Sequence, residues 1–343
     1  MMLAYRVVAI AIVSVLAAFA AHSQPSDVQR SGGRVFAKGG WVEARRIVDE
    51  AGRLFANPQL LAARGDTAYV YDAGTQELIA ILHDGSVRWR VGRAGKGPRE
   101  FSNPVDLQVA PNGTLHVLDS DVSRITIVDP AGRVAYMRTI EERLHRIVPR
   151  RSGWWGVSLG RPDLFVSLGS DGRASAERGV AAPADIATRH ILIREPQVAV
   201  VPNGGAVVGF VWSSRLLLVD RDGRLAADLD GPEHIPFADI RSYTIETPRV
   251  ATVQRIDPKA THGARLVAAN DSMAVVVFGG NSRDAGRVVD RYDLRSTRYV
   301  DSAYLTRPPA ALRVVGNRLV ALELDPAPAL VVYDWRPAGS AAR

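Results

Sequence analysis

The chain has 343 residues without a cysteine, and its 43 Lys and Arg residues outnumber its 36 Asp and Glu residues by seven. The lack of cysteine excludes disulfides and thiolate catalysis, and predicts that no lipid is attached near the N-terminus. Charges of both signs are interspersed without long runs. This pattern favours a solvated surface with a small excess of positive charge over a nucleic-acid-binding face. We therefore expect no nucleic-acid partner.

The N-terminal segment has the layout of a secretory signal peptide. Arg6 precedes an apolar run over residues 7–21, and Ala18–Ala20 and Ala21–Ser23 are small-x-small cleavage patterns. The run is shorter than the ~20 residues needed to cross a bilayer, so cleavage is favoured over an uncleaved membrane anchor. We expect a signal peptide over residues 1–23, a flexible segment over 24–40, the folded domain over 41–335 and a disordered tail over 336–343. The mature protein is then a periplasmic or extracellular monomer without a membrane-spanning segment.

Two stretches of the chain repeat one pattern 47 residues apart. Asn57-Pro58 corresponds to Asn103-Pro104, and Gly85 corresponds to Gly132. A period of this length, built of short apolar runs between Gly, Pro, Asn and Asp, is typical of β-propeller repeats. Six segments fit one template of four strands, and they begin near residues 57, 103, 144, 195, 264 and 311.

The sixth segment has three strand-like runs instead of four, and Trp41–Val48 is a strand-like run that precedes the first segment. We predict that this N-terminal strand completes the last blade. The result is an all-β, six-bladed propeller of four-stranded antiparallel blades, closed so that no strand edge is left to aggregate. A pair of β-sandwiches is the alternative, but it does not predict the recurring turns.

The second repeat also resembles a known group of proteins. Its characteristic residues are Gly92, Gly95, Gly97, Pro98, Phe101, Pro104, Gly113, Asp119, Arg124, Asp129 and Gly132. In this order they resemble the NHL-type six-bladed β-propellers of exported bacterial proteins. The resemblance implies a fold and no single activity, because propellers serve as binding modules, scaffolds, lactonases and lyases.

Two motifs are interpreted as parts of the scaffold. Gly92–Pro98 is Gly-rich and contains Lys96, but neither Ser nor Thr follows the lysine and a strand comes next. We predict a connector with positive backbone dihedrals instead of a phosphate-binding loop. Five Asp residues are assigned to equivalent repeat positions, where each caps a turn: Asp72, Asp119, Asp220, Asp293 and Asp334.

The innermost strands of a propeller begin at one mouth of its central channel, and here these positions differ from blade to blade. The candidate site residues at this mouth are Asn57, Asn103, His145, Glu195, His262 and Arg307. Related lactonases hold a divalent metal in the channel, which implies Glu195, Asn57 and Asn103 as ligands and calcium as the metal. His145 or His262 would then transfer protons, and Asp106 is a further channel acid. A water-filled polar channel is the alternative.

The longest interruption of the repeat is Gly231–His262, which contains three candidate binding residues, His234, Arg241 and Tyr243. A long loop on a rigid scaffold often carries binding, although a neutral excursion is the alternative. Trp154 and Trp155 are adjacent in the third segment. Strand alternation predicts that one fills the core and the other is exposed. The exposed ring could stack on a sugar or peptide, although core filling is the favoured alternative.

The sequence contains no nucleophile elbow, zinc-binding helix or dinucleotide fingerprint. No motif requires a cofactor, although calcium is compatible with the channel mouth. We favour an exported binding or scaffold module for a protein, peptide or glycan. The alternative is a calcium-dependent lactonase, esterase-like hydrolase or lyase acting at the channel mouth.

Overall fold

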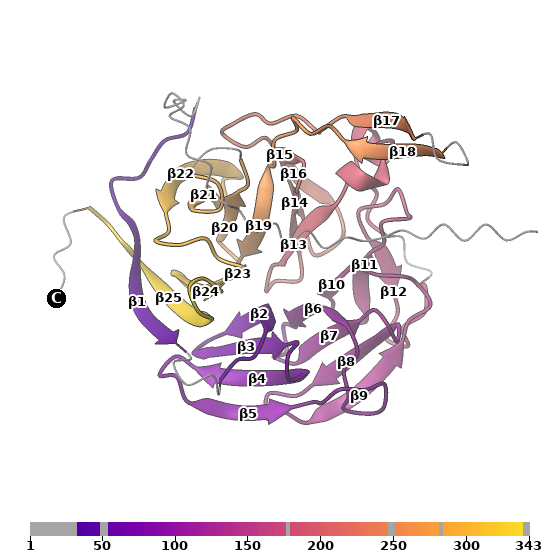
Figure 1. Cartoon of the computed structure of the whole chain (residues 1–343), viewed down its shortest axis with the longest axis vertical. Helices are drawn as coiled ribbons and strands as arrows, with labels where there is room; N and C mark the ends of the chain where they lie inside the picture. Colours follow the sequence, from indigo (N-terminus) through magenta and orange to yellow (C-terminus); the bar gives the residue numbers. More distant parts are fainter. Residues whose placement is uncertain (1–32, 49–53, 176–178, 246–250, 281–283, 339–343) are drawn as a thin grey trace, which may run out of the picture. The chain divides into compact units, whose positions relative to one another are not determined.

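The computed structural model describes residues 33–48, 54–175, 179–245, 251–280 and 284–338. The predicted signal peptide and the end of the predicted tail lie outside these residues. Six antiparallel sheets form a ring, which confirms the predicted six-bladed β-propeller (Figure 1). The innermost strands of successive blades contact one another, and the last blade contacts the first.

Blades 1 and 2 are the two copies of the clearest repeat. Blade 1 consists of β2 (Pro58–Arg64), β3 (Thr67–Asp72), β4 (Glu77–Leu82) and β5 (Val87–Val91), and blade 2 of β6 (Pro104–Val109), β7 (Leu115–Asp119), β8 (Arg124–Val128) and β9 (Val134–Thr139). In each blade the strands pair in chain order, from the innermost strand outward.

Blade 3 is reduced, as its sequence indicated. It consists of β10 (Arg146–Pro149), β11 (Trp154–Val157) and β12 (Val166–Leu168). In place of a regular fourth strand, the chain makes isolated bridges between Leu168 and Ala174 and between Phe165 and Val180. Two short helices follow, α1 (Ala184–Ala187) and the 3-10 helix η1 (Ile191–Ile193).

Blades 4 and 5 return to four strands, and the insertion separates them. Blade 4 consists of β13 (Pro196–Val200), β14 (Ala206–Phe210), β15 (Ser213–Val219) and β16 (Leu225–Leu229). The insertion forms a hairpin of β17 (Ile240–Ile245) and β18 (Ala251–Ile256). Blade 5 consists of β19 (Ala264–Ala269), β20 (Met273–Phe278), β21 (Val288–Asp293) and β22 (Arg298–Tyr304). Within the described residues, no helix is long and apolar enough to cross a membrane.

The N-terminal strand completes blade 6, as predicted. The blade consists of β23 (Ala311–Val315), β24 (Arg318–Glu323), β25 (Ala329–Arg336) and β1 (Gly40–Val48), with β1 outermost against β25. Trp41 packs edge-on against Trp335, with ring centroids 5.0 Å apart. Arg46 reaches past β25 to the buried Glu323 at 2.9 Å, so an ion pair reinforces the closure of the ring.

Six apolar clusters fill the spaces between neighbouring blades, so each blade is buried on both faces. This arrangement corrects the expectation that one of Trp154 and Trp155 is exposed and agrees with the core-filling alternative, because both residues are buried, at 2% and 4% exposure. Trp154 faces blade 2, and Trp155 faces blade 4. Alternation does send them to opposite sides of the strand, but in a propeller both sides are core.

Candidate functional site

Asp106 lies on the inner strand β6, where it is buried and holds two blades together. Its Oδ2 accepts a hydrogen bond from the Ile147 amide of blade 3 at 2.7 Å. Its Oδ1 accepts from the Leu107 amide at 3.0 Å and from Gln108 Nε2 at 2.9 Å. Burial raises the pKa of Asp106, while these donors and the nearby guanidinium of Arg146 oppose that rise.

Two arginines from other blades accompany Asp106. Arg146 Nη1 donates to the carbonyls of His145 and Val105, at 2.8 and 3.2 Å, and so links blade 3 to blade 2. Arg313 Nη1 donates to the Leu312 carbonyl at 2.8 Å, and burial lowers the pKa of Arg313 while Asp106 opposes that effect. The Asp106 carboxylate and the guanidiniums of Arg146 and Arg313 thus form hydrogen bonds that link the inner strands of different blades.

The two mouth asparagines occupy equivalent places, and both are exposed. The backbone amide of Asn57 donates to Asp72 Oδ1 at 3.0 Å, and that of Asn103 donates to Asp119 Oδ1 at 3.0 Å. The Asn103 side chain donates to Ser120 Oγ at 3.0 Å within its own blade. Both asparagines therefore form hydrogen bonds within their own blade.

The other mouth candidates have separate surroundings. Burial and then Arg146 lower the pKa of His145, and burial and then Arg265 lower that of His262. The His262 ring packs against Trp212, with centroids 4.2 Å apart. Glu195 is exposed, and Arg307 Nη1 donates to the Asp325 carbonyl at 3.3 Å. In the described part of the chain, no three His, Asp or Glu side chains are grouped as a metal site would need.

The five turn aspartates do not occupy equivalent positions, which corrects their assignment from the sequence. Asp72 and Asp119 end the second strands of blades 1 and 2 and are fully buried. Asp220 and Asp293 instead follow or end third strands, where they accept hydrogen bonds from backbone amides of the next turn. Asp334, also on a third strand, pairs with Arg318 at 2.8 Å. Four of the five cap backbone amides as predicted, but from two different places in the repeat.

The Gly-rich stretch from Gly92 is a connector, as predicted. Gly92 has φ 113° and Gly95 has φ 143°, and a Cβ on Gly92 would lie 2.5 Å from the Phe101 ring. Arg124 of blade 2 donates to the carbonyls of Lys96 and Glu100, at 2.9 and 2.6 Å. The carbonyls of this loop are therefore bound to an arginine, and the loop has the structural role expected of it.

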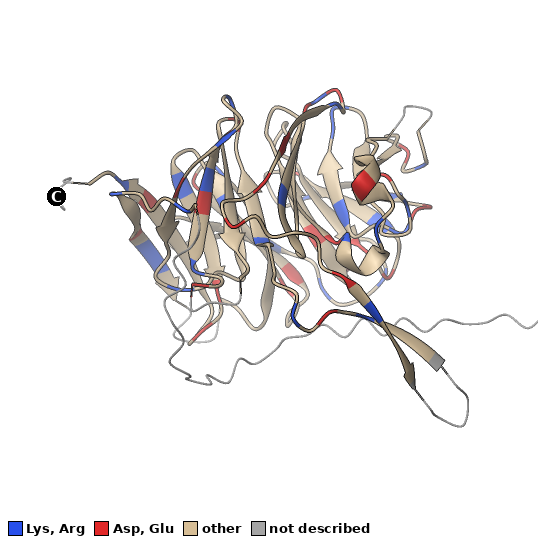
Figure 2. Ribbon diagram, turned by 90° about the horizontal axis from the view of Figure 1, so that it is seen from above, with Lys and Arg blue, Asp and Glu red and all other residues tan. Residues whose placement is uncertain are grey.

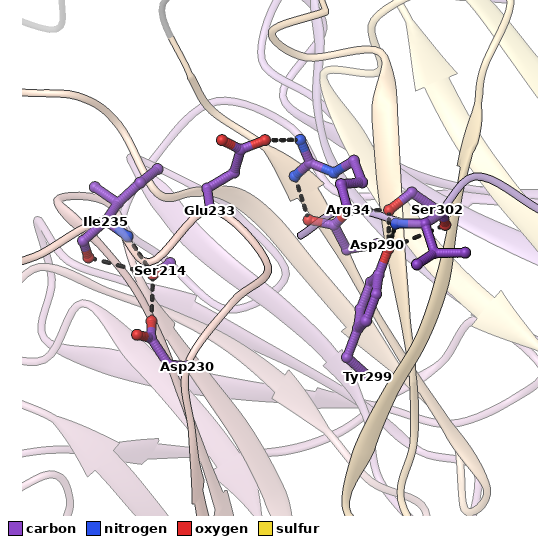
Figure 3. Close-up of polar contacts among 9 residues, drawn as sticks. Arg34, Ser214, Asp230, Glu233, Ile235, Asp290, Tyr299 and Ser302 are labelled. Carbon is purple, nitrogen blue, oxygen red and sulfur yellow. Dashed lines mark hydrogen bonds and ion pairs between the residues drawn. The ribbon is translucent and has the colours of Figure 1, made fainter. Parts of the chain in front are cut away.

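A polar cluster around Arg34 was not indicated by the sequence (Figure 3). Arg34 donates to Asp290 through Nε, at 2.9 Å to Oδ1, and through Nη2, at 2.8 Å to Oδ2. Its Nη1 forms an ion pair with Glu233 of the insertion. The guanidinium also lies 4.3 Å from the centroid of the Phe278 ring. Arg34 belongs to the segment that we expected to be flexible, yet its side chain is only 2% exposed.

The start of the insertion is bound to blade 4 beside this cluster (Figure 3). Ser214 Oγ donates to Asp230 Oδ1 at 2.5 Å and accepts from the Ile235 amide at 2.7 Å. His234 Nδ1 lies 2.9 Å from Asp230 Oδ2. His234, a predicted binding residue, thus bonds with an acid at the base of the insertion and lies outside the hairpin.

The hairpin β17–β18 projects from the ring (Figures 1 and 2), and it forms a sheet of two strands. Gln254 Oε1 lies 2.8 Å from His190 Nε2, so this face of the hairpin meets the loop that carries η1. The opposite face presents two cross-strand pairs, Arg241 with Arg255 and Tyr243 with Val253. Two of the three predicted insertion residues, Arg241 and Tyr243, therefore share one outward face.

Comparisons with known proteins find similarity in fold but not in sequence. No protein-family model matches it, and no curated protein sequence matches it. A proposed exported protein from Bacteroides fragilis is 9% identical over 87% of this chain and 94% of its own, with a TM-score of 0.52. A member of the DUF4221 family from Bacteroides vulgatus is 9% identical over 89% of this chain and 99% of its own, with a TM-score of 0.53. The chain is a six-bladed β-propeller similar in fold to these proteins, and identities this low concern the fold alone.

Proposed function

We propose that this protein is an exported β-propeller that binds a protein partner through the β17–β18 hairpin, with the ring as its scaffold. The observation that carries the proposal is the hairpin's outward face, where Tyr243 is 40% exposed between the two arginines and the tip. Tyr and Arg are enriched in protein interfaces, because they combine a large contact area with polar groups.

The physics of a two-stranded ribbon supports a binding role. An isolated hairpin is marginally stable in water, and both of its outer strand edges have unpaired backbone groups. The base is held by the His190–Gln254 contact and by Arg241 Nε, which donates to Asp257 Oδ2 at 2.7 Å. Arg255 is exposed and has no ion pair among the residues that the structure describes. A partner can therefore form backbone hydrogen bonds with the strand edges, pack against the Tyr243 ring and form an ion pair with Arg255.

Export is supported by the N-terminal sequence pattern, and the similar fold from Bacteroides fragilis belongs to a proposed exported protein. The inner strands support a scaffold role, since the polar groups of Asp106 and Arg146 bind the strands of blades 2 and 3 together. We infer that the ring is a rigid support and that the hairpin makes the contact.

Site-specific photo-crosslinking in the native cells tests this proposal. A benzophenone amino acid replaces Tyr243 on the hairpin or, as the matched control, Tyr136 on β9, which is 44% exposed on the outside of blade 2. We expect a discrete adduct with one protein from position 243 and none from position 136. Identical adduct patterns at both positions, or no adduct at 243, would contradict the proposal.

A further inference from the structure

Residues 33–37 lie on blade 5 in the way that a bound peptide would. They extend along the outer edge of β22, where Phe36 forms a parallel bridge with Ser302. The Ala37 amide donates to the Ser302 carbonyl at 2.9 Å, and the Ser302 amide donates to the Val35 carbonyl at 2.8 Å. Addition of an extended segment to a sheet edge is a common mode of peptide recognition.

Arg34 supplies the specific anchor of this segment. The bidentate contact with Asp290 fits the planar guanidinium fork, and a lysine ammonium cannot reproduce it. Asp290 is itself prepared for this contact, because Ser302 Oγ donates to its Oδ1 at 2.5 Å. A cavity of about 10 Å³, the space of roughly one water molecule, remains beside the arginine, so the guanidinium nearly fills the pocket.

Phe36 makes the second side-chain contact, two residues after the anchor. Its ring stacks on that of Tyr304 with centroids 5.0 Å apart and planes 4° from parallel. Tyr299 adds a polar contact, because its hydroxyl accepts a hydrogen bond from the Val35 amide at 3.1 Å. The edge of β22 and its neighbours thus bind three features of the segment, namely its arginine, its extended backbone and its aromatic ring.

Ring closure does not need this segment. β1 pairs with β25 from Gly40 to Val48, and Gly39 separates this strand from the preceding residues. The side chains of Val35 and Phe36 remain 60% and 40% exposed. Arg34 is therefore the one deeply buried group of a segment that otherwise rests on the surface.

We propose that the edge of β22, with Asp290, Glu233 and Phe278, is a binding site for an extended peptide that carries arginine followed two residues later by an aromatic residue. Residues 34–36 are its occupant in cis. A tethered segment acts at an effective concentration in the millimolar range, so it suppresses weak binding of a free peptide until it is displaced. The site is separate from the hairpin, and the proposal does not depend on the hairpin's function.

The test uses the whole mature chain with Arg34→Ser and Phe36→Ser, which weakens the occupant in cis and leaves β1 in place. The probe is a fluorescent peptide with the sequence of residues 32–38, Gly-Gly-Arg-Val-Phe-Ala-Lys. By fluorescence anisotropy we expect saturable binding to this variant, at least tenfold tighter than to the wild type. Replacing the peptide's arginine by lysine, or adding Asp290→Asn to the variant, should each weaken binding at least tenfold.

Phe36→Ser alone provides a second measurement, because it removes an exposed ring and keeps the buried ion pair. We expect the peptide to bind this variant at least threefold more tightly than the wild type. Absence of saturable binding to both variants would overturn the proposal. Binding that is unaffected by the lysine peptide or by Asp290→Asn would overturn it equally.

Discussion

Arg34 and Asp290 form a bidentate ion pair between residues that are 256 positions apart, with side chains only 2% and 4% exposed. The pair binds the segment that precedes β1 to blade 5, while β1 itself completes blade 6. The N-terminal part of the described chain therefore joins two neighbouring blades, through one strand and one side chain.

Arg34→Ala should lower the free energy of unfolding by about 3–5 kcal/mol, because Asp290 is left buried without its cation. Urea unfolding of the wild type, both single variants and the double variant Arg34→Ala/Asp290→Asn gives the coupling between them. We expect the double variant to be more stable than Arg34→Ala alone. Additive losses, or a loss below about 1 kcal/mol for Arg34→Ala, would contradict the buried pair.

His116 should make stability depend on pH in the acid range. Burial lowers the pKa of His116 to about 4, and Trp154 Nε1 donates to His116 Nδ1 at 2.7 Å, which requires an unprotonated acceptor. The unfolded side chain titrates near ~6.5, so between these values the unfolded state binds more protons. The free energy of unfolding therefore rises from about pH 4 to 6.5, and lowering the pH from 7 to 4.5 removes about 2–3 kcal/mol of it.

His116→Gln tests this prediction, because glutamine keeps an acceptor but does not titrate. Urea unfolding at pH 4.5 and at pH 7 should show a smaller difference for the variant than for the wild type. Parallel pH profiles for the two proteins would show that His116 does not set the dependence.

The two kinds of turn aspartate should differ in their contribution to stability. Asp72 is fully buried and accepts from four backbone amides, those of Ala56, Asn57, Gly74 and Thr75. Asp72→Ala leaves several buried donors without acceptors and should cost about 3 kcal/mol or more. Asp220→Ala, in a turn on the outer part of blade 4, should cost about 1 kcal/mol. Equal losses in chemical denaturation would remove the distinction between the two positions.

If β1 closes the ring, deleting it should abolish cooperative unfolding, and reattaching it at the other end of the chain should restore cooperative unfolding. Deleting residues 33–48 exposes the edge of β25 and removes Trp41 from the core, so we expect the cooperative thermal transition to disappear. Because Gly40 pairs with Arg336, residues 40–48 can be reattached after β25 through a short turn. Circular dichroism melting should show that this permuted chain recovers a cooperative transition. A deletion variant that melts like the wild type would refute closure by this strand.

Local patterns predicted the blades well, because each repeat carries its own turn residues and strand periodicity. The missing strand of the last blade predicted closure, since an open ring would leave a strand edge unpaired. The equivalence of Asp72 with Asp220 was wrong because an aspartate can follow either the second or the third strand of one repeat. The prediction that one of Trp154 and Trp155 is exposed failed because a propeller buries both sides of a strand.

Long-range contacts could not be predicted in the same way. Nothing near Arg34 in the sequence indicates Asp290, since the pairing depends on how the N-terminal segment crosses blade 5. The mouth residues were predicted from their place in the repeat, and whether their side chains meet depends on side-chain direction, which the repeat does not specify. Asn103, for example, directs its amide to Ser120 of its own blade.

The most direct test of the proposed function uses the partner protein that is captured by the crosslinker at position 243. The measurement is the affinity of this partner for chains with and without the hairpin. The matched variants replace residues 241–255 by a short Gly-Ser linker, or carry Arg34→Ser and Phe36→Ser with the hairpin intact. By isothermal titration calorimetry we expect the hairpin replacement to abolish binding while the second variant binds within about threefold of the wild type. Wild-type affinity in a folded chain without the hairpin would contradict the proposal that the hairpin makes the contact.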